Sequence, residues 1–157
     1  MSTITIVKYD DTYKEDLNRL LLSFSREVFN EETANIDQFV DYHWCIYLAL
    51  KDGEVVGFTS FIYNTYYGMR TPTVGNDYAY IVPHHRGSKT MYLFSLQAGK
   101  VSLQYDLPLE VYYASDDSRR LGKQIQGDLM YEAIIYPTSE ISRKFKALTT
   151  KIEIKND

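Results

Sequence analysis

A chain of 157 residues has the size of one domain, and we expect a single domain over residues 1–157 with a substantial core. The formal net charge of −4 argues against general binding to nucleic acid or to an anionic membrane, because either partner requires a basic face. Cys45 is the only cysteine, which excludes an internal disulfide, and no apolar run approaches the roughly 20 residues of a membrane span. We therefore expect a cytoplasmic protein without a membrane partner.

The N-terminal part of the chain predicts one strand and two helices. Residues 3–7 alternate as a strand does, and residues 10–12 offer caps for the helix that follows. The apolar positions of this helix recur at spacings of three and four, so they form one core-facing stripe: Leu17, Leu20, Leu21, Phe24 and Val28. A second, shorter helix that ends near residue 42 carries Ile36, Phe39, Val40 and His43 on one face.

A β-hairpin is predicted next, from two apolar runs at residues 45–50 and 54–63. Asp52 and Gly53 lie between them, and Asp-Gly is among the strongest short-range signals for a tight hairpin turn. Gly57 interrupts the second strand, which indicates a bulge or a close approach of another backbone.

The C-terminal half predicts alternating strands and helices after a long polar loop at residues 64–76. A strand at 77–82, a helix at 90–104 and a strand at 108–114 imply a right-handed crossover between parallel strands. The helix should bury Met91, Phe94, Ala98 and Val101. A helix at 115–126 and a strand at 130–136 follow, and the remainder allows edge strands through which two chains could pair as a homodimer.

The segment between the strand at 77–82 and the helix at 90–104 has the character of an anion site. Its Gly and Ser precede a helix N-terminus, where backbone N–H groups lack intrahelical partners, and Arg86 and Lys89 add positive charge. The predicted ligand is a phosphate or pyrophosphate, and the alternative is a solvated basic turn. The candidate binding residues are Val82, Arg86, Gly87, Ser88, Lys89 and Thr90.

The order of the predicted elements, the hairpin phrase at residues 49–58 and the segment from Pro83 to Ser88 resemble the GNAT superfamily of acyl-CoA-dependent N-acyltransferases. The resemblance implies a single-domain α/β (α+β) fold: a mixed, mostly antiparallel sheet with splayed central parallel strands and about four flanking helices. It also implies that the loop holds the pyrophosphate of acetyl-CoA, the acyl donor. No metal is expected, because no recognised zinc spacing is present.

Acyl transfer to an amine needs a base, and the resemblance implies Asp77, because members of the family often place an acidic residue on this strand. The alternative is that Asp77 closes a turn formed by Gly75 and Asn76. His84 or His85 could also serve as the base, or they could stand exposed in the loop.

The reaction also needs an acid for the leaving thiolate. The tyrosine that the family commonly uses for this purpose is replaced by Lys123, so Tyr112 or Tyr113, or else Tyr131, would have to substitute.

Two functions follow from these observations. The first is an N-acetyltransferase whose acceptor is a small-molecule amine or a protein lysine, and the acidic balance of the chain favours a cationic acceptor. The second is a catalytically inactive binding or inhibitory protein of the same fold. It is motivated by Lys89, Met91 and Lys123, which stand where the family pattern has glycines and a tyrosine.

Overall fold

The computed structural model describes residues 3–65, 72–87, 89–112, 128–130 and 133–136. Within these residues it holds three α-helices: α1 (Lys14–Phe24), α2 (Ile36–Tyr42) and α3 (Thr90–Tyr105). The described strands are β1 (Ile4–Lys8), β2 (Cys45–Lys51), β3 (Glu54–Asn64), β4 (Thr73–Ile81), β5 (Leu109–Tyr112), β6 (Asp128–Met130) and β7 (Ala133–Tyr136). They hydrogen-bond in the order β1-β2-β3-β4-β5-β7-β6. Strands β4 and β5 run parallel, whereas the pairs β1–β2, β2–β3, β5–β7 and β6–β7 are antiparallel.

The contacts divide the chain into two units. The first comprises the described residues of Met1–Ile62 and Tyr78–Phe94, and the second those of Tyr63–Asp77 and Ser95–Asp157. Strands β3 and β4 and helix α3 contribute residues to both units.

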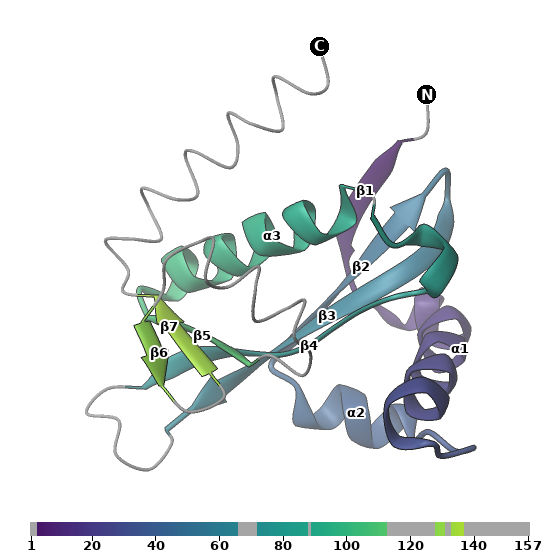
Figure 1. Ribbon diagram of the computed structural model, residues 1–157, viewed down its shortest axis with the longest axis horizontal. Helices are drawn as coiled ribbons and strands as arrows, with labels where there is room; N and C mark the ends of the chain where they lie inside the picture. The colour runs from purple at the N-terminus through teal and green to yellow at the C-terminus, as the bar shows by residue number, and fades with distance from the viewer. Residues whose placement is uncertain (1–2, 66–71, 88, 113–127, 131–132, 137–157) are drawn as a thin grey trace. The chain divides into compact units, whose positions relative to one another are not determined.

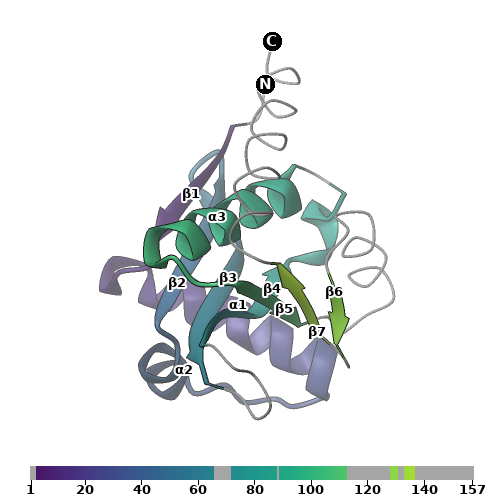
Figure 2. The ribbon, with the colours of Figure 1, turned by 90° about the vertical axis from the view of Figure 1, so that its left-hand side faces the viewer.

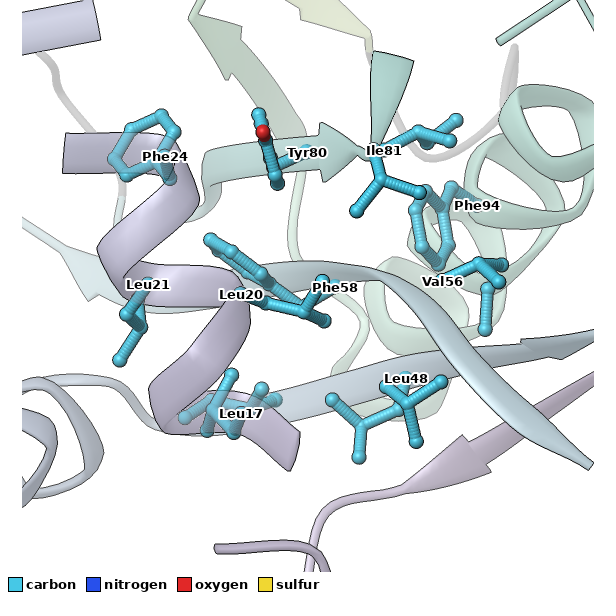
Figure 3. Packing of buried hydrophobic residues seen from close by; sticks show 14 residues of the cluster. Leu17, Leu20, Leu21, Phe24, Leu48, Val56, Phe58, Tyr80, Ile81 and Phe94 are labelled. Atoms are coloured by element: carbon cyan, nitrogen blue, oxygen red, sulfur yellow. The ribbon is translucent and has the colours of Figure 1, made fainter. Parts of the chain in front are cut away.

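The core of the first unit joins α1 to the strands β2, β3 and the end of β4, which Figure 1 shows with their neighbours. Leu17 and Leu20 of α1 are fully buried, as are Leu48 of β2 and Phe58 of β3. Figure 3 shows Phe24 beside Tyr80 of β4, and Phe94 of α3 beside Ile81. The predicted stripes of α1 and α3 are therefore confirmed, except that Met91 is only partly buried and Val28 is not in the core.

Val28 corrects the sequence prediction. It is 48% exposed, because α1 ends at Phe24 and the chain continues as the π-helical turn η2 (Ser25–Phe29). The i→i+5 bonds of a π turn are wider than those of an α-helix, so the α-helical spacing no longer decides which residue faces the core. Asn30 ends the turn in the left-handed conformation with φ of 55°.

The predicted hairpin is confirmed, with β2 and β3 joined by a turn in which Asp52 and Gly53 both have positive φ. Both expectations for Gly57 also hold. The β2–β3 register shifts beside it, between Ala49 and Leu50, and a Cβ on Gly57 would lie 2.6 Å from the carbonyl oxygen of Tyr80. Gly57 thus lets β4 approach β3 at this point.

The second unit contains the parallel pair, in which Val74, Gly75 and Asn76 of β4 match Leu109, Glu110 and Val111 of β5. Figure 2 shows β5, β7 and β6 side by side. The predicted start of β4 at residue 77 is wrong, because β4 begins at Thr73 and pairing with β5 keeps Gly75 and Asn76 in the strand despite their turn-forming residue types. The single strand predicted at 130–136 is also wrong: Met130 pairs with Ala133, so β6 and β7 run antiparallel.

The predicted helix at 115–126 and the C-terminal edge strands lie outside the described residues. Within the described part of the chain, no helix is both long enough and apolar enough to cross a membrane.

Candidate functional site

The candidate site in the first unit is the connection between β4 and α3, which we call the 82–90 loop. Its start is fixed to β3, because the Val82 N–H donates to the Val56 carbonyl at 3.0 Å. A short 3-10 turn, η3 (Pro83–His85), follows, and the His85 N–H closes it onto the Val82 carbonyl at 3.0 Å. The predicted succession of strand, turn and helix is confirmed.

The second part of the loop leads into the helix through Gly87. This residue has φ of +79°, and nothing lies within 4 Å of the place where a Cβ would be. Lys89 directly precedes α3, and its carbonyl accepts from the Leu93 N–H of the first helical turn at 3.1 Å. Thr90, the first residue of α3, is buried. Backbone N–H groups at such a helix start can hold an anion. The Arg86 N–H donates to the Pro83 carbonyl at 3.2 Å, so we look for anion donors in the residues that follow it.

The Arg86 side chain is held by contacts inside the first unit. Its Nε donates to the Ile81 carbonyl at 2.9 Å. Its Nη1 and Nη2 reach Oε1 and Oε2 of Glu27 at 2.7 Å and 2.8 Å, which makes a two-pronged ion pair. The guanidinium also lies 5.5 Å from the centre of the Tyr80 ring. Arg86 therefore turns back towards β4 and η2.

Tyr80 completes this cluster, because its hydroxyl donates to Glu27 Oε2 at 3.0 Å. Burial, followed by the hydrogen bond to Glu27, raises the pKa of Tyr80 to about 12. The hydrogen bond from Arg86 holds the pKa of Glu27 below its ordinary value, and the same bond raises the pKa of Arg86. Glu27 is thus a carboxylate that stays ionised and joins η2 to the end of β4 and to the 82–90 loop.

The rings of the two loop histidines lie close together, with centres 4.3 Å apart and planes tilted by 47°. His84 is exposed, whereas His85 is half-buried. Among the described residues, no group of three His, Cys, Asp or Glu side chains could hold a metal ion.

Asp77 lies in β4, one residue beyond the last pair of the parallel ladder, and is half-buried. The alternative that it closes a turn with Gly75 and Asn76 is wrong, because both residues belong to the strand and pair with β5. The backbone of Tyr112 ends β5 and pairs with Ala133 of β7. Ser88, Tyr113, Lys123 and Tyr131 lie outside the described residues.

Sequence reasoning missed one acidic residue in the second unit. Glu110 is only 5% exposed and pairs with Gly75 across the parallel ladder. Its Oε2 accepts from the Thr73 hydroxyl at 2.8 Å and from Asn64 Nδ2 at 3.2 Å. Both described donors are neutral, so this carboxylate is held in place by hydrogen bonds and not by a described ion pair. Its signal in the sequence is a single acidic residue inside the apolar run from Leu109 to Val111.

No protein-family model and no curated protein matches the sequence, but solved structures match it in fold. One is a single-residue mutant of the toxin AtaT bound to the C-terminus of the antitoxin AtaR and acetyl-CoA, with a TM-score of 0.69 and 17% identity. The match covers 92% of this chain and 99% of that chain. A GNAT-family acetyltransferase from Staphylococcus aureus Mu50 has a TM-score of 0.63 and 14% identity, over 86% of this chain and 98% of that chain. A ribosomal-protein-alanine N-acetyltransferase from Brucella melitensis biovar Abortus 2308 has a TM-score of 0.63 and 19% identity, over 82% of this chain and 94% of that chain.

The chain therefore has a mixed α/β fold with a mostly antiparallel sheet, and this fold is that of the GNAT superfamily. The parallel ladder of β4 and β5 ends at Asn76 and Val111, whereas β4 itself continues to Ile81.

Proposed function

We propose that the protein is an N-acyltransferase that moves an acetyl group from acetyl-CoA to a primary amine. The observation that carries this proposal is the 82–90 loop, in which a strand ends, Gly87 takes a left-handed conformation with open space beside it, and α3 begins at Thr90. Such a turn favours an anion such as a pyrophosphate. The fold supports the choice of anion, because a neighbour was solved with acetyl-CoA.

The bound donor would supply an activated acetyl thioester. The residues proposed to form its pyrophosphate site, by contact with the phosphates or by holding the loop in place, are Val82, Arg86, Gly87, Ser88, Lys89 and Thr90. The chain must further remove a proton from the attacking amine and return one to the leaving thiolate. Tyr112 and Tyr113 are the proposed sources of the second proton.

Asp77 and Glu110 are the two candidates for the base. Glu110 is the stronger one on geometry, because two hydrogen bonds and burial fix the position of its carboxylate. A base that is fixed before the substrate binds loses little freedom in the reaction. Asp77 is held in the strand as well, but its side chain is more exposed.

The proposed acceptor is an amine on a small molecule or on a protein lysine. The net charge of −4 favours a cationic acceptor over nucleic acid. The ribosomal-protein-alanine N-acetyltransferase among the neighbours supports an amine on a protein as the acceptor.

A second candidate is an inactive binding or inhibitory protein of the same fold. The pairing of Arg86 with Glu27 favours it, because the most basic group of the loop already has an anionic partner. Lys89 and Met91 at family glycine positions point in the same direction.

A transfer assay separates the two candidates. The purified protein is incubated with acetyl-CoA and a panel of polyamines, aminoglycosides and lysine peptides, and both free thiol and acetylated product are measured. We expect thiol release that depends on one class of amine, with product in equal amount. Binding of acetyl-CoA without transfer to any amine would favour the inactive binding protein.

A further inference from the structure

The Glu27 carboxylate connects two parts of the first unit that are far apart in the sequence. It is 53 positions from Tyr80 and 59 positions from Arg86, and it contacts both side chains. Tyr80 is buried beside Phe24 and Phe58, so one side of the Glu27 carboxylate is attached to the buried core. The other side holds the 82–90 loop through Arg86.

The geometry of Arg86 limits what else it can bind. A guanidinium grips a phosphate best with two neighbouring N–H groups on one edge. In this structure Glu27 occupies the edge formed by Nη1 and Nη2, and the Ile81 carbonyl occupies Nε. All three nitrogens of Arg86 are therefore engaged by the protein itself.

The π turn η2 is what brings Glu27 to this place. Phe24, the last residue of α1, contacts the Tyr80 ring, and Glu27 reaches the Tyr80 hydroxyl three residues later. Val28, which an uninterrupted α-helix would turn towards the core, is exposed instead. Wide turns of this kind occur often at functional sites.

We propose that Glu27 is a positioning residue for the anion site, acting through Arg86. In this role Arg86 is a structural link, which we call the strut, between the start of the 82–90 loop and η2 and β4. The backbone N–H groups that follow Arg86 then bind the phosphate. The inference rests on the proposed function, because it assumes that the loop binds the pyrophosphate of CoA. The competing arrangement is one in which Arg86 binds phosphate directly and Glu27 competes with it.

The two arrangements predict opposite effects of Glu27→Gln, which keeps the size of the side chain and an acceptor for Tyr80 but removes the charge. Calorimetric titration with CoA should show binding weakened by about 10-fold to 100-fold if Glu27 positions the strut. Unchanged or tighter binding would overturn the inference. The matched control is Glu32→Gln, which breaks the exposed pair with Arg26 (2.8 Å) near the same turn and should leave CoA binding unchanged.

An exchanged pair gives a second test. The double variant Glu27→Arg with Arg86→Glu restores the ion pair with its two charges exchanged. If Arg86 acts only as the strut, the CoA affinity of this variant should lie within about tenfold of the wild type. A direct phosphate contact predicts loss of binding in a folded double variant, because residue 86 would then repel the phosphate, and this result would overturn the inference. Where the double variant does not fold, Glu27→Gln decides.

Amide hydrogen exchange tests the positioning without any ligand. The peptide covering residues 82–94 should exchange faster in Glu27→Gln than in Glu32→Gln, because the loop has lost its strut. Equal exchange would overturn the inference whether or not CoA binds. The two ideas can also fail separately. If the wild type binds no CoA but residues 82–94 still exchange faster in Glu27→Gln, Glu27 does position the loop and the proposed function is wrong.

Discussion

Two acidic residues of the second unit differ in how firmly they are held. Glu110 is buried between the Thr73 hydroxyl and the Asn64 amide, whereas Asp77 is half-buried just beyond the parallel ladder. A buried carboxylate without a described cationic partner is costly for stability, so its presence needs a reason. The reason that we propose is proton transfer from the acceptor amine.

Substitution of the two carboxylates should show which of them acts as the base. Glu110→Gln keeps the acceptor oxygen for Thr73 but cannot take a proton, so we expect turnover to fall by about 10²–10⁴ with CoA affinity unchanged. Asp77→Asn is the matched control and should lower turnover less than about tenfold. Steady-state rates and CoA titrations of both variants measure this, and the reverse ranking would return the role of base to Asp77.

Tyr80 should make stability depend on pH in the alkaline range. Its pKa is about 12 in the folded protein, above the ordinary value of 10.0, so the unfolded chain ionises first as the pH rises. The stabilisation is therefore complete below pH 10 and is lost between pH 10 and 12. Urea unfolding across this range should show a smaller loss of unfolding free energy for Tyr80→Phe than for the wild type.

The control for this experiment is Tyr42→Phe, whose side chain is 66% exposed and which should retain the wild-type dependence on pH. If Tyr80→Phe and the wild type lost the same unfolding free energy as the pH rises, the Tyr80 hydroxyl would not be the source of the pH dependence.

At the scale of the elements, the hairpin of β2 and β3 was predictable because its signals are local. Asp52 and Gly53 specify a turn with positive φ, and the alternating runs beside them specify the strands. The π turn η2 was not predictable, because α1 and η2 have the same apolar spacing in the sequence. The partners of Glu27 in this turn, Tyr80 and Arg86, lie 53 and 59 positions further along the chain, so no local signal announces them.

Gly57 makes the close approach of β3 and β4 testable. Gly57→Ala should lower the free energy of unfolding by about 2–3 kcal/mol, because the new Cβ would meet the Tyr80 carbonyl at 2.6 Å and backbone cannot easily move aside. Gly53→Asn is the control, since nothing lies within 4 Å of that position and Asn tolerates positive φ. Chemical denaturation should show that the control loses less than about 1 kcal/mol of unfolding free energy. Equal losses would show that the approach at Gly57 is not tight.

For the whole molecule, the sequence predicted the order of the elements up to β5 and the place of the 82–90 loop. It failed where pairing between distant segments decides the outcome. Gly75 and Asn76 are turn-forming residue types, yet they lie in a strand because β5 pairs with them. Glu27 and Glu110 were missed for the same reason, since their partners are 59 and 37 positions away along the chain.

We propose that this chain uses its GNAT-type fold to bind an acyl-CoA. Calorimetric titration with CoA and with acetyl-CoA tests it most directly, accompanied by thermal unfolding of the same samples. We expect a dissociation constant in the micromolar range and a melting temperature that rises with ligand concentration, because a ligand bound only by the native state stabilises it. No heat of binding and no thermal shift at millimolar ligand would contradict the claim.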